Sequence, residues 1–440
     1  MITSPNWRYK PYIPYDRLEN TGKPYICSIK PGKNSICGEV LKASDGTVLY
    51  RPYKSEQPLK TVEFHGKMFE ISKLEEDTNY EFYVKTDTGE SLLRLARTSS
   101  VPGTVVNYLH PEDKAYSFSG NYLCSPSIVK LPSGRIITSM DVYGNGMPQN
   151  LTILMKSDDN GYSFSYLCEL FPLFWGKLFY HKNALYILGT STEYGDLLIG
   201  RSLDEGETWS SPTVIARGSC SPVERGFHRA PTVILNENGM LLTAIEYGTH
   251  CKNEFLSALL YSDENADLLD AASWKLSPFL PLDKSVLEKY PERNRAIEGN
   301  LVLSPEGELI NFLRLELNTA VLYKADIDKP HKGFNFYRTL DFPMAHTKFE
   351  IQKKDGTYYA VGNRPPKRNV LSLYTSTDLI IWTHNKDILD YSNYDMQKVA
   401  FQYPAFIFEE NNINILSRTA FGGAHSFHDS NYQTFHTINL

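Results

Sequence analysis

The sequence has few residues of the kind that build metal centres or disulfide frameworks. Its six cysteines are scattered along 440 residues without a Cys-x-x-Cys pair, so neither a structural zinc site nor a set of disulfides is indicated. Cys27 and Cys37 are the pair that could bridge within one domain, but reduced thiols are the interpretation that a cytoplasmic location favours. We therefore expect no metal and no cofactor.

Long apolar runs and basic blocks are also missing. No apolar stretch approaches the length that spans a bilayer, and the first residues lack the basic and apolar regions of a secretory leader. The formal charge is −6, and lysine and arginine do not cluster, which argues against nucleic acid or a membrane as a partner. We expect a cytoplasmic protein, or a secreted one if a leader has been removed. The sequence leaves the oligomeric state open.

Helical periodicity is nearly absent after residue 105, and short apolar runs separated by turn residues recur instead. Six times, a polar or small cluster opens an apolar run, a turn follows, and a second apolar run ends 15 to 17 residues after the start. The starting and ending residues are Cys124 and Asp141, Trp175 and Ser191, Arg229 and Glu246, Glu298 and Arg314, Thr347 and Arg364, and Tyr403 and Arg418. This regular spacing predicts one antiparallel hairpin used six times.

A second repeated motif lies in the outer half of these units. Residues 157–164 and 202–209 match the Asp box, S-x-D-x-G-x-T-W, while residues 376–382 form a decayed copy and residues 262–274 a copy opened by an insertion. The Asp caps a tight turn, the Gly supplies a positive φ, and the aromatic residue packs between sheets, so the box is structural. Four strands in each of six units predict a six-bladed β-propeller over residues 101–440.

Residues 24–100 do not follow this period. Residues 74–86 alternate between apolar and polar side chains and resemble a strand of fibronectin type III domains. They predict a small fibronectin-III-like β-sandwich over residues 24–100, with Tyr80 as the residue of a tyrosine corner. Residues 1–23 are rich in Pro and Tyr and are expected to form an extended arm. The predicted fold class is therefore all-β.

The first strand of each blade lines the central funnel of a propeller, so its start and the end of the second strand face one shared pocket. The six-fold alignment selects candidates for this pocket, which are His228, Arg229, Glu298, Lys348 and Tyr403 at strand starts, and Asp141, Glu246, Arg314, Arg364 and Arg418 at strand ends. Burying so many charges costs more than apolar packing unless a ligand uses them. For any single residue, an ion pair that ties blades together is the alternative interpretation.

Three segments resemble parts of the exo-sialidases. Residues 298–314 are similar to the segment in which a Glu opens a strand and an Arg closes the hairpin. Residues 368–382 resemble the segment with a second substrate Arg before an Asp box, and residues 403–408 the strand that begins with the nucleophilic Tyr. The resemblance implies these roles: Tyr403 as nucleophile, Glu298 as its base, Asp141 as acid/base, and Arg314 with Arg368 as a clamp for a sugar carboxylate. The other candidates are expected to bind substrate: Arg229, Glu246, Arg418, His228, Arg364 and Lys348.

Two positions depart from the sialidase pattern. Cys124 stands where those enzymes carry an Arg that opens the first blade, and residues 144–150 contain no carboxylate where the acid/base Asp usually lies. The sequence Phe-His-Arg-Ala-Pro at residues 227–231 echoes the missing motif in the third unit, so Arg229 is the candidate for a replacement cation. Glu193 and Asp196 are alternative candidates for the acid.

These observations predict a retaining exo-glycosidase that releases a terminal acidic sugar from an oligosaccharide or glycoconjugate, most simply an exo-α-sialidase. A neutral Tyr nucleophile suits such a sugar, because a carboxylate nucleophile would be repelled by the sugar's own carboxylate. Two alternatives stay open: a polysaccharide lyase or unusual glycosidase acting on uronic-acid glycans, and a non-catalytic glycan-binding propeller. We interpret residues 425–429 as the turn that replaces the Asp box of the sixth unit, rather than as metal ligands.

Overall fold

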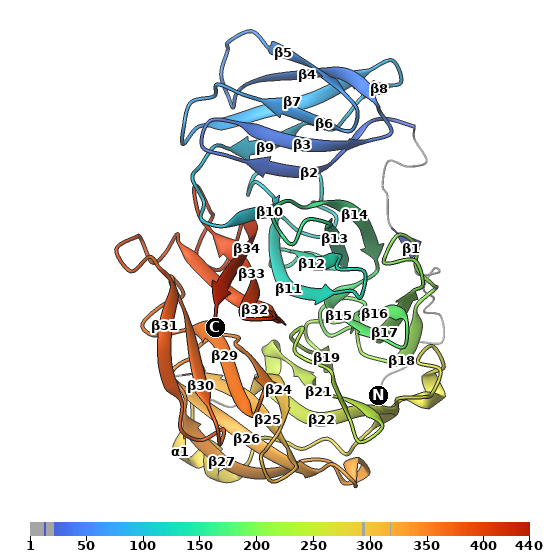
Figure 1. Ribbon diagram of the computed structural model, residues 1–440, viewed down its shortest axis with the longest axis vertical. Coiled ribbons are helices and arrows are strands. Elements are labelled where there is room, and N and C mark those ends of the chain that lie inside the picture. The colour runs from blue at the N-terminus through green and yellow to red at the C-terminus, as the bar shows by residue number, and fades with distance from the viewer. Residues whose placement is uncertain (1–12, 15–21, 293–294, 317) are drawn as a thin grey trace. The chain divides into compact units, whose positions relative to one another are not determined.

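The computed structural model describes residues 13–14, 22–292, 295–316 and 318–440 (Figure 1). These residues form strands almost throughout, with a single α-helix among them, α1 (Lys284–Lys289). None of the described helices is long and apolar enough to cross a membrane. The chain divides into two compact units, which we describe separately. The first unit contains residues 171–392 and 401–406, and the second contains the described parts of residues 14–170 together with 393–400 and 407–440.

The first unit contains four antiparallel sheets, each built from consecutive strands. The strands of the first two sheets, in sheet order, are β15 (Phe174–His181), β16 (Ala184–Thr190), β17 (Leu197–Ser202) and β18 (Thr213–Ala216), and then β19 (Gly226–His228), β21 (Met240–Thr249), β22 (Glu254–Asp263) and β23 (Lys275–Leu276). The short strand β20 (Leu235–Glu237) also pairs with β21. The other two sheets consist of β24 (Ile297–Leu303), β25 (Glu308–Glu316), β26 (Thr319–Asp326) and β27 (Asn335–Asp341), and of β28 (Glu350–Lys354), β29 (Thr357–Asn363), β30 (Val370–Ser376) and β31 (Thr383–Asp390).

Neighbouring sheets of the first unit share apolar cores. One core joins the β15–β18 sheet to the sheet of β19–β23, a second continues to the β24–β27 sheet, and a third continues to the β28–β31 sheet. Strands such as β16 are buried on both faces and read as continuous apolar runs, whereas β31 is polar and largely exposed. Sheets that pack face to face in this way, with a polar strand on the outer edge, are the arrangement expected of propeller blades.

Two further sheets of the same kind lie mainly in the second unit, although Ile13, Phe171 and residues 401–406 of their strands belong to the first. Their strands in order are β11 (Tyr122–Lys130), β12 (Ile136–Tyr143), β13 (Leu151–Ser157) and β14 (Ser165–Phe171), with β1 (Ile13–Pro14) beside β14; and β32 (Ala400–Glu409), β33 (Asn412–Ala420), β34 (Tyr432–Asn439) and β10 (Thr104–Tyr108). The fourth strand of the last sheet therefore comes from the beginning of the repeated region. Pairing β10 with β34 joins the two ends of this region within one sheet, with β10 as one of its edge strands.

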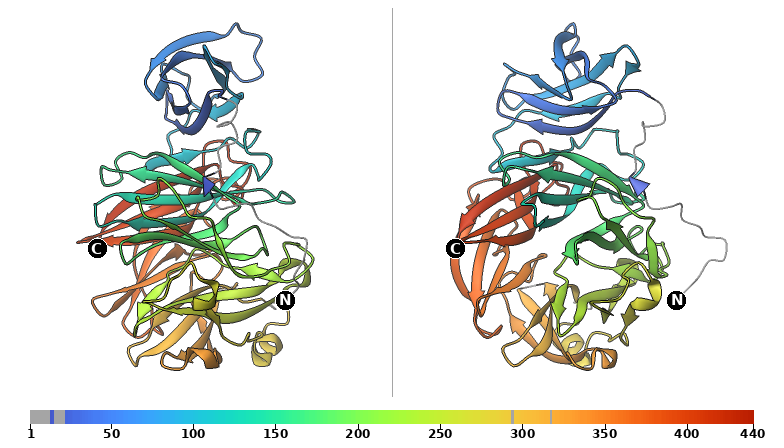
Figure 2. Two further views of the ribbon diagram at one scale, coloured as in Figure 1. Left: turned by 90° about the vertical axis from the view of Figure 1, so that its right-hand side faces the viewer. Right: turned by 45° about the vertical axis from the view of Figure 1, so that its right-hand side comes forward.

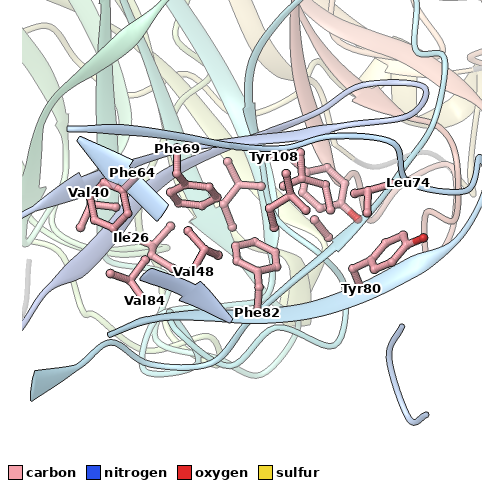
Figure 3. Packing of buried hydrophobic residues seen from close by; sticks show 14 of the residues in the cluster. Ile26, Val40, Val48, Phe64, Phe69, Leu74, Tyr80, Phe82, Val84 and Tyr108 are labelled. Atoms are coloured by element: carbon pink, nitrogen blue, oxygen red, sulfur yellow. The ribbon is translucent and has the colours of Figure 1, made fainter. Parts of the chain in front are cut away.

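Residues 25–97 form two more sheets, which lie as two layers in Figures 1 and 2. Their strands are β2 (Tyr25–Pro31), β3 (Ile36–Leu41) and β6 (Met68–Ile71); and β5 (Lys60–His65), β4 (Asp45–Pro52), β7 (Asn79–Thr86), β8 (Gly89–Glu90) and β9 (Arg94–Arg97). Alternate side chains of both sheets meet in one core, shown in Figure 3, which also takes in Tyr108 and Tyr432. Tyr80 is buried there, and its hydroxyl accepts the backbone N–H of Glu75 at 3.0 Å, a contact of the tyrosine-corner kind.

The repeated hairpin is present in all six sheets of the region from Thr104 to Asn439. Cys124 pairs with Asp141 as the spacing predicts, whereas Glu246 and Arg314 pair with His228 and Ile297, one residue before the predicted starts. The first strand of the fifth hairpin begins only at Glu350, three residues beyond the predicted start at Thr347. The prediction of the hairpins from spacing alone is confirmed.

The Asp boxes join the third strand of a sheet to the fourth. In the turn between β17 and β18, the Asp204 carboxylate accepts the backbone N–H of Thr208 (2.8 Å). Trp209 is buried there, and its Nε1–H donates to the carbonyl of Gly206 (3.0 Å). The decayed box keeps the same geometry, although Leu379 at φ 65° stands where Gly206, at φ 93°, lies in the intact box. The boxes are structural turns, as expected.

The interpretation of residues 425–429 as an Asp-box turn was wrong. They lie between β33 and β34, the second and third strands of their sheet, whereas the boxes follow third strands. Because the fourth strand, β10, comes from far upstream in the chain, this sheet has no turn in which a box could form. Within the segment, His425 and His428 both contact Asp429, at 2.8 and 2.9 Å.

Replacing Asp204 by Ala is expected to lower the free energy of unfolding by about 1–2 kcal/mol. The Thr208 N–H and the hydroxyls of Thr208 and Ser202 all donate to this carboxylate and would lose their acceptor. Asp204→Asn keeps one acceptor oxygen and should cost clearly less. Thermal or urea unfolding of both variants measures the difference, and equal losses would show that the hydrogen bonds do not hold the turn.

Candidate active site

Tyr403 on β32 and Glu298 on β24 are both residues of the first unit, and their side chains meet. The Tyr403 hydroxyl donates to Oε1 of Glu298 at 2.9 Å. Glu298 is 6% exposed, whereas Tyr403 is partly open to solvent. A phenol that donates to a buried carboxylate has a base in place to remove its proton, which is the arrangement of an activated nucleophile.

Both residues lie in an unusual backbone conformation at the start of their strands. Glu298 has φ 62° and Tyr403 φ 50°, and Trp175 holds the equivalent place in β15 with φ 53°. In β24 and β15 the strand register shifts at this point, which marks a β-bulge. A bulge turns a side chain away from the regular alternation of a strand, and bulky residues keep a positive φ mainly where their surroundings enforce it. The three residues share a positive φ near the start of the first strand of a sheet, and for Glu298 and Trp175 it coincides with a bulge.

Two arginines flank the pair. Nε of Arg314 lies 3.0 Å from Oε2 of Glu298, and this guanidinium is 7% exposed. Arg368 is more open, and its guanidinium carbon lies 5.8 Å from the centre of the Tyr403 ring. Its Nη1 donates to Oε1 of Gln402 at 2.6 Å. Two cations beside one carboxylate give the site an excess of positive charge, which favours an anionic group on a ligand.

The loop that carries Arg368 is tied to the strand of Tyr403. The carbonyl of Arg368 accepts the N–H of Phe401 at 2.9 Å and the side-chain amide of Asn363 at 3.0 Å. The same Asn363 amide also donates to the carbonyl of Phe401 at 2.7 Å. One buried Asn therefore fixes the loop and β32 together, which sets the position of Arg368 against Tyr403.

Aromatic rings line the site beside Glu298. Trp175 packs edge-to-face on His228 with ring centres 4.4 Å apart, and Phe255 lies 5.0 Å from the same ring. The ring of His250 lies 5.1 Å from that of Phe255, and its Nδ1 accepts a hydrogen bond from Nη1 of Arg295 at 2.8 Å. Burial lowers the pKa of His228 to about 4, so its ring is neutral near pH 7.

Glu246 and Arg229 were predicted to bind substrate, but both are 1% exposed and make internal contacts. Glu246 accepts the backbone N–H groups of Glu298 and Gly299, and burial raises its pKa to about 7. Arg229 donates to the carbonyl of Leu188 at 2.7 Å, and burial lowers its pKa to about 10. Their side chains support the site from within the protein.

Lys348 and Arg364 take part in ion pairs between protein groups. Buried Lys348 lies 3.1 Å from Glu350 and also donates to the carbonyl of Pro404. Arg364 binds Asp387 on β31 through Nε and Nη2, at 2.9 Å each. For these two residues the structure matches the alternative interpretation, in which charges hold strands together.

Asp141 and Arg418 belong to the second unit. Asp141 is 1% exposed and accepts the Thr152 hydroxyl at 2.5 Å. The guanidinium of Arg418 lies 5.5 Å from the centre of the Tyr143 ring, and its Nη2 donates to the carbonyl of His428. Their assignment to the substrate pocket stays a prediction.

The two alternative acids differ in their surroundings. Asp196 is fully buried, accepts the N–H of Gly218 and pairs with Arg217, both at 2.7 Å, so it holds a turn. Glu193 is partly exposed and interacts with Tyr194, whose ring centre lies 6.4 Å from that of Trp175. Glu193 is therefore the better placed of the two. Among the described residues no group of three or more His, Cys, Asp or Glu side chains is arranged to hold a metal.

Sequence reasoning missed Trp175, His250, Arg295 and Gln402. Trp175 begins the second hairpin, at the position that gives Glu298 and Tyr403 in other units, so the repeat alignment contained a signal for it. Gln402 is adjacent to Tyr403 but carries no motif of its own. His250 and Arg295 lie in segments between strands, for which the repeat makes no prediction.

Repeated four-stranded sheets with Asp boxes between their third and fourth strands define an Asp-box β-propeller. The family model described as "BNR repeat-like domain" matches residues 178–415, more than half of the sequence, and the chain belongs to this family. The sequence matches none of the curated proteins.

Several solved structures share the fold at low sequence identity. An α-L-arabinanase from Penicillium chrysogenum is 12% identical with a TM-score of 0.51, covering 77% of this chain and 98% of its own. The Hadza microbial sialidase Hz136 is 12% identical with a TM-score of 0.52, covering 93% of both chains. A protein of unknown function from Dyadobacter fermentans is 14% identical with a TM-score of 0.53, covering 77% and 100%. At this identity the likeness shows the fold, which is all-β and of the propeller type.

Proposed function

We propose that the protein is a retaining exo-glycosidase that releases a terminal acidic sugar, and most specifically an exo-α-sialidase. The observation that carries the proposal is the 2.9 Å hydrogen bond from the Tyr403 hydroxyl to Glu298. The solved structures of the same fold include a sialidase and an arabinanase, which supports glycoside hydrolysis as the general class. The choice of sialic acid depends on the charge of the site.

In the proposed reaction, Glu298 takes the proton of Tyr403 while the phenolate oxygen forms a bond to the anomeric carbon. The bond from that carbon to the leaving-group oxygen breaks, and the leaving oxygen takes a proton from an acid, a role that only the sequence resemblance assigns to Asp141. Water then attacks the same carbon and gives a proton to the acid that was deprotonated in the first step, while the bond to Tyr403 breaks and Glu298 returns the phenol proton. Two displacements retain the anomeric configuration.

The charges explain why the sugar would be acidic. Arg314 lies beside Glu298 and Arg368 beside Tyr403, so a carboxylate on the anomeric carbon would find a cation within reach. A phenol is neutral until Glu298 deprotonates it, so it approaches such a sugar without repulsion. A neutral sugar would leave the excess positive charge unmatched.

The test is incubation of the purified protein with a fluorogenic α-sialoside while proton NMR follows the first sugar released. We expect turnover, with the α-anomer of the free sugar appearing before mutarotation. Parallel incubations with polysaccharides of uronic acid are monitored for ultraviolet absorbance from a new C=C bond. Unsaturated products without sialoside turnover would establish a lyase, and glycan binding without any product would establish a non-catalytic propeller.

A further inference from the structure

Glu246 lies at the bulge that carries Glu298 and binds its main chain. Oε1 of Glu246 accepts the backbone N–H of Gly299 at 3.1 Å, and Oε2 accepts the backbone N–H of Glu298 at 3.2 Å. The same Oε2 lies 3.1 Å from Nδ1 of His228. One buried carboxylate therefore connects the catalytic candidate Glu298 to the ring that packs on Trp175.

The bulge needs such contacts because its conformation is strained. Glu298 has φ 62°, a region that side chains with a Cβ rarely occupy. Thr232 donates to the carbonyl of Gly299 at 2.8 Å, and a Cβ at position 299 would lie only 2.4 Å from Oδ1 of Asn311. Glu246 on β21 and Thr232, between β19 and β20, thus make three hydrogen bonds to Glu298 and Gly299 on β24. These bonds fix the direction in which the Glu298 side chain leaves the strand.

Ionised and protonated Glu246 cannot make the same set of bonds. The carboxylate accepts at both oxygens, and neutral His228 can donate its Nδ1–H to Oε2. A proton on Oε2 makes that oxygen a donor to Nδ1, provided that His228 then carries its own proton on Nε2. In that state Oε2 is a poorer acceptor for the N–H of Glu298, and weakening a buried hydrogen bond lowers the stability of the bulge.

We propose that Glu246 is a positioning residue that couples proton uptake to the orientation of Glu298. Its carboxylate holds the bulge so that Glu298 reaches Tyr403, and protonation, with a tautomer change in His228, releases the bulge. The consequence for turnover rests on the proposed function, whereas the proton-linked change itself does not. The sequence-based role of Glu246 in substrate binding is replaced by one that acts through another residue.

The groups that face Glu246 support this switch. Burial raises the pKa of Glu246 to about 7. The backbone N–H groups of Gly299 and Glu298 and the positive charge of Arg229 lower this pKa and only partly offset the effect of burial. Glu246 is therefore mainly ionised above pH 7 and mainly protonated below. Turnover should fall as the pH drops through this value, because the bulge is then released.

His228 stays neutral while Glu246 titrates, as a tautomer change requires. Burial is the main cause of its low pKa, the charge of Glu298 raises that pKa, and the charges of Arg314 and Arg295 lower it further. The ring of His250 also faces His228, with centres 5.7 Å apart. The net effect keeps a second proton off the ring over the range in which Glu246 changes state.

The first experiment uses no substrate and follows the fluorescence of Trp175 against pH. Subtracting the spectrum of a Trp175→Phe variant isolates this indole, which touches His228 and should sense a change in the ring's hydrogen bonds. We expect a transition with its midpoint near pH 7 that disappears in Glu246→Gln. The matched control is Glu254→Gln, an exposed Glu on β22 that pairs with Arg225, and it should keep the transition.

The second experiment measures turnover of the fluorogenic α-sialoside by the same variants. Glu246→Gln should lower kcat about 10- to 100-fold, since misplacing a catalytic group by about 1 Å costs about that much, with KM changed little. The acidic limb near pH 7 should be lost as well. If Glu246→Gln fails to fold, Glu246→Asp keeps the charge but shortens the side chain, and it should shift the fluorescence midpoint.

The outcomes separate the two proposals. A fluorescence transition that is absent in the unmodified protein, or that persists unchanged in the Glu246 variants, overturns the switch whatever the activity. A transition that follows Glu246 in a protein without sialoside turnover supports the switch and refutes the sialidase. A kcat that is unaffected by Glu246→Gln in an active enzyme removes the positioning role.

Discussion

Replacing Tyr403 by Phe is expected to lower kcat for an α-sialoside by about a thousand-fold or more, because removal of a nucleophile abolishes the covalent route. The substitution removes one oxygen and the hydrogen bond to Glu298 but leaves the ring beneath Arg368. Substrate should therefore still bind, with KM changed by only a few-fold. Initial rates over a range of substrate concentrations separate the two quantities.

The matched control is Tyr337→Phe on β27, a Tyr that is 39% exposed and packs beside Arg338. It should leave both kcat and KM unchanged. Glu298→Gln tests the base, and its kcat should also fall by about 10²- to 10⁴-fold, the usual range for loss of a general base. Wild-type rates in the Tyr403 variant would exclude Tyr403 as the nucleophile. Of the proposal, only glycoside hydrolysis as the general reaction class would then remain.

Replacing Arg368 by Leu is expected to raise KM for an acidic sugar about 10- to 100-fold, which corresponds to losing one hydrogen bond to a charged group. Arg368 is the more open of the two arginines beside Tyr403, and Gln402 and the anchored loop hold it there. A neutral glycoside should bind with similar affinity to both proteins. Comparing KM for the two substrates isolates the contribution of the sugar's carboxylate.

Arg364→Leu provides the matched control from the same loop. Its guanidinium binds Asp387, so the variant should lose stability while KM stays unchanged. The hydrogen bond from Arg364 is the largest cause of the low pKa of Asp387, and hydrogen bonds from Ser372 and His384 lower it further, so the pKa of this carboxyl should rise in the variant without reaching its ordinary value. A rise in KM for the Arg364 variant equal to that for Arg368→Leu would mean that the net charge of the loop, and not the position of Arg368, binds the sugar.

The repeat spacing was sufficient to predict the hairpins because the spacing is set by local structure. A turn residue, the alternation or continuity of apolar side chains, and the cap of an Asp box are all set within about twenty residues. The same alignment brought Glu298, Arg314 and Tyr403 into one set, since a repeated strand start occupies a repeated place in the sheet. Trp175 belonged to this set and was overlooked because its side chain carries no charge.

The alignment could not tell which charges of the set face a ligand. Glu246 and Arg314 both end a second strand, yet one binds the backbone of the neighbouring sheet and the other binds the Glu298 side chain. Lys348 and Arg364 likewise meet acidic partners, Glu350 and Asp387, which the repeat does not single out. Each difference depends on the residue that the adjacent strand or sheet places opposite.

The sequence by itself determined the strands, the turns, the Asp boxes and the order of Glu298, Arg314, Arg368 and Tyr403 along the chain. The tertiary structure decided which of these side chains meet, because residues 105 positions apart form the Tyr403–Glu298 hydrogen bond. It also decided their direction, since a positive φ at a bulge moves a side chain away from the face that strand alternation assigns to it. Contacts between sheets hold those bulges in place, and such contacts have no local signature in the sequence.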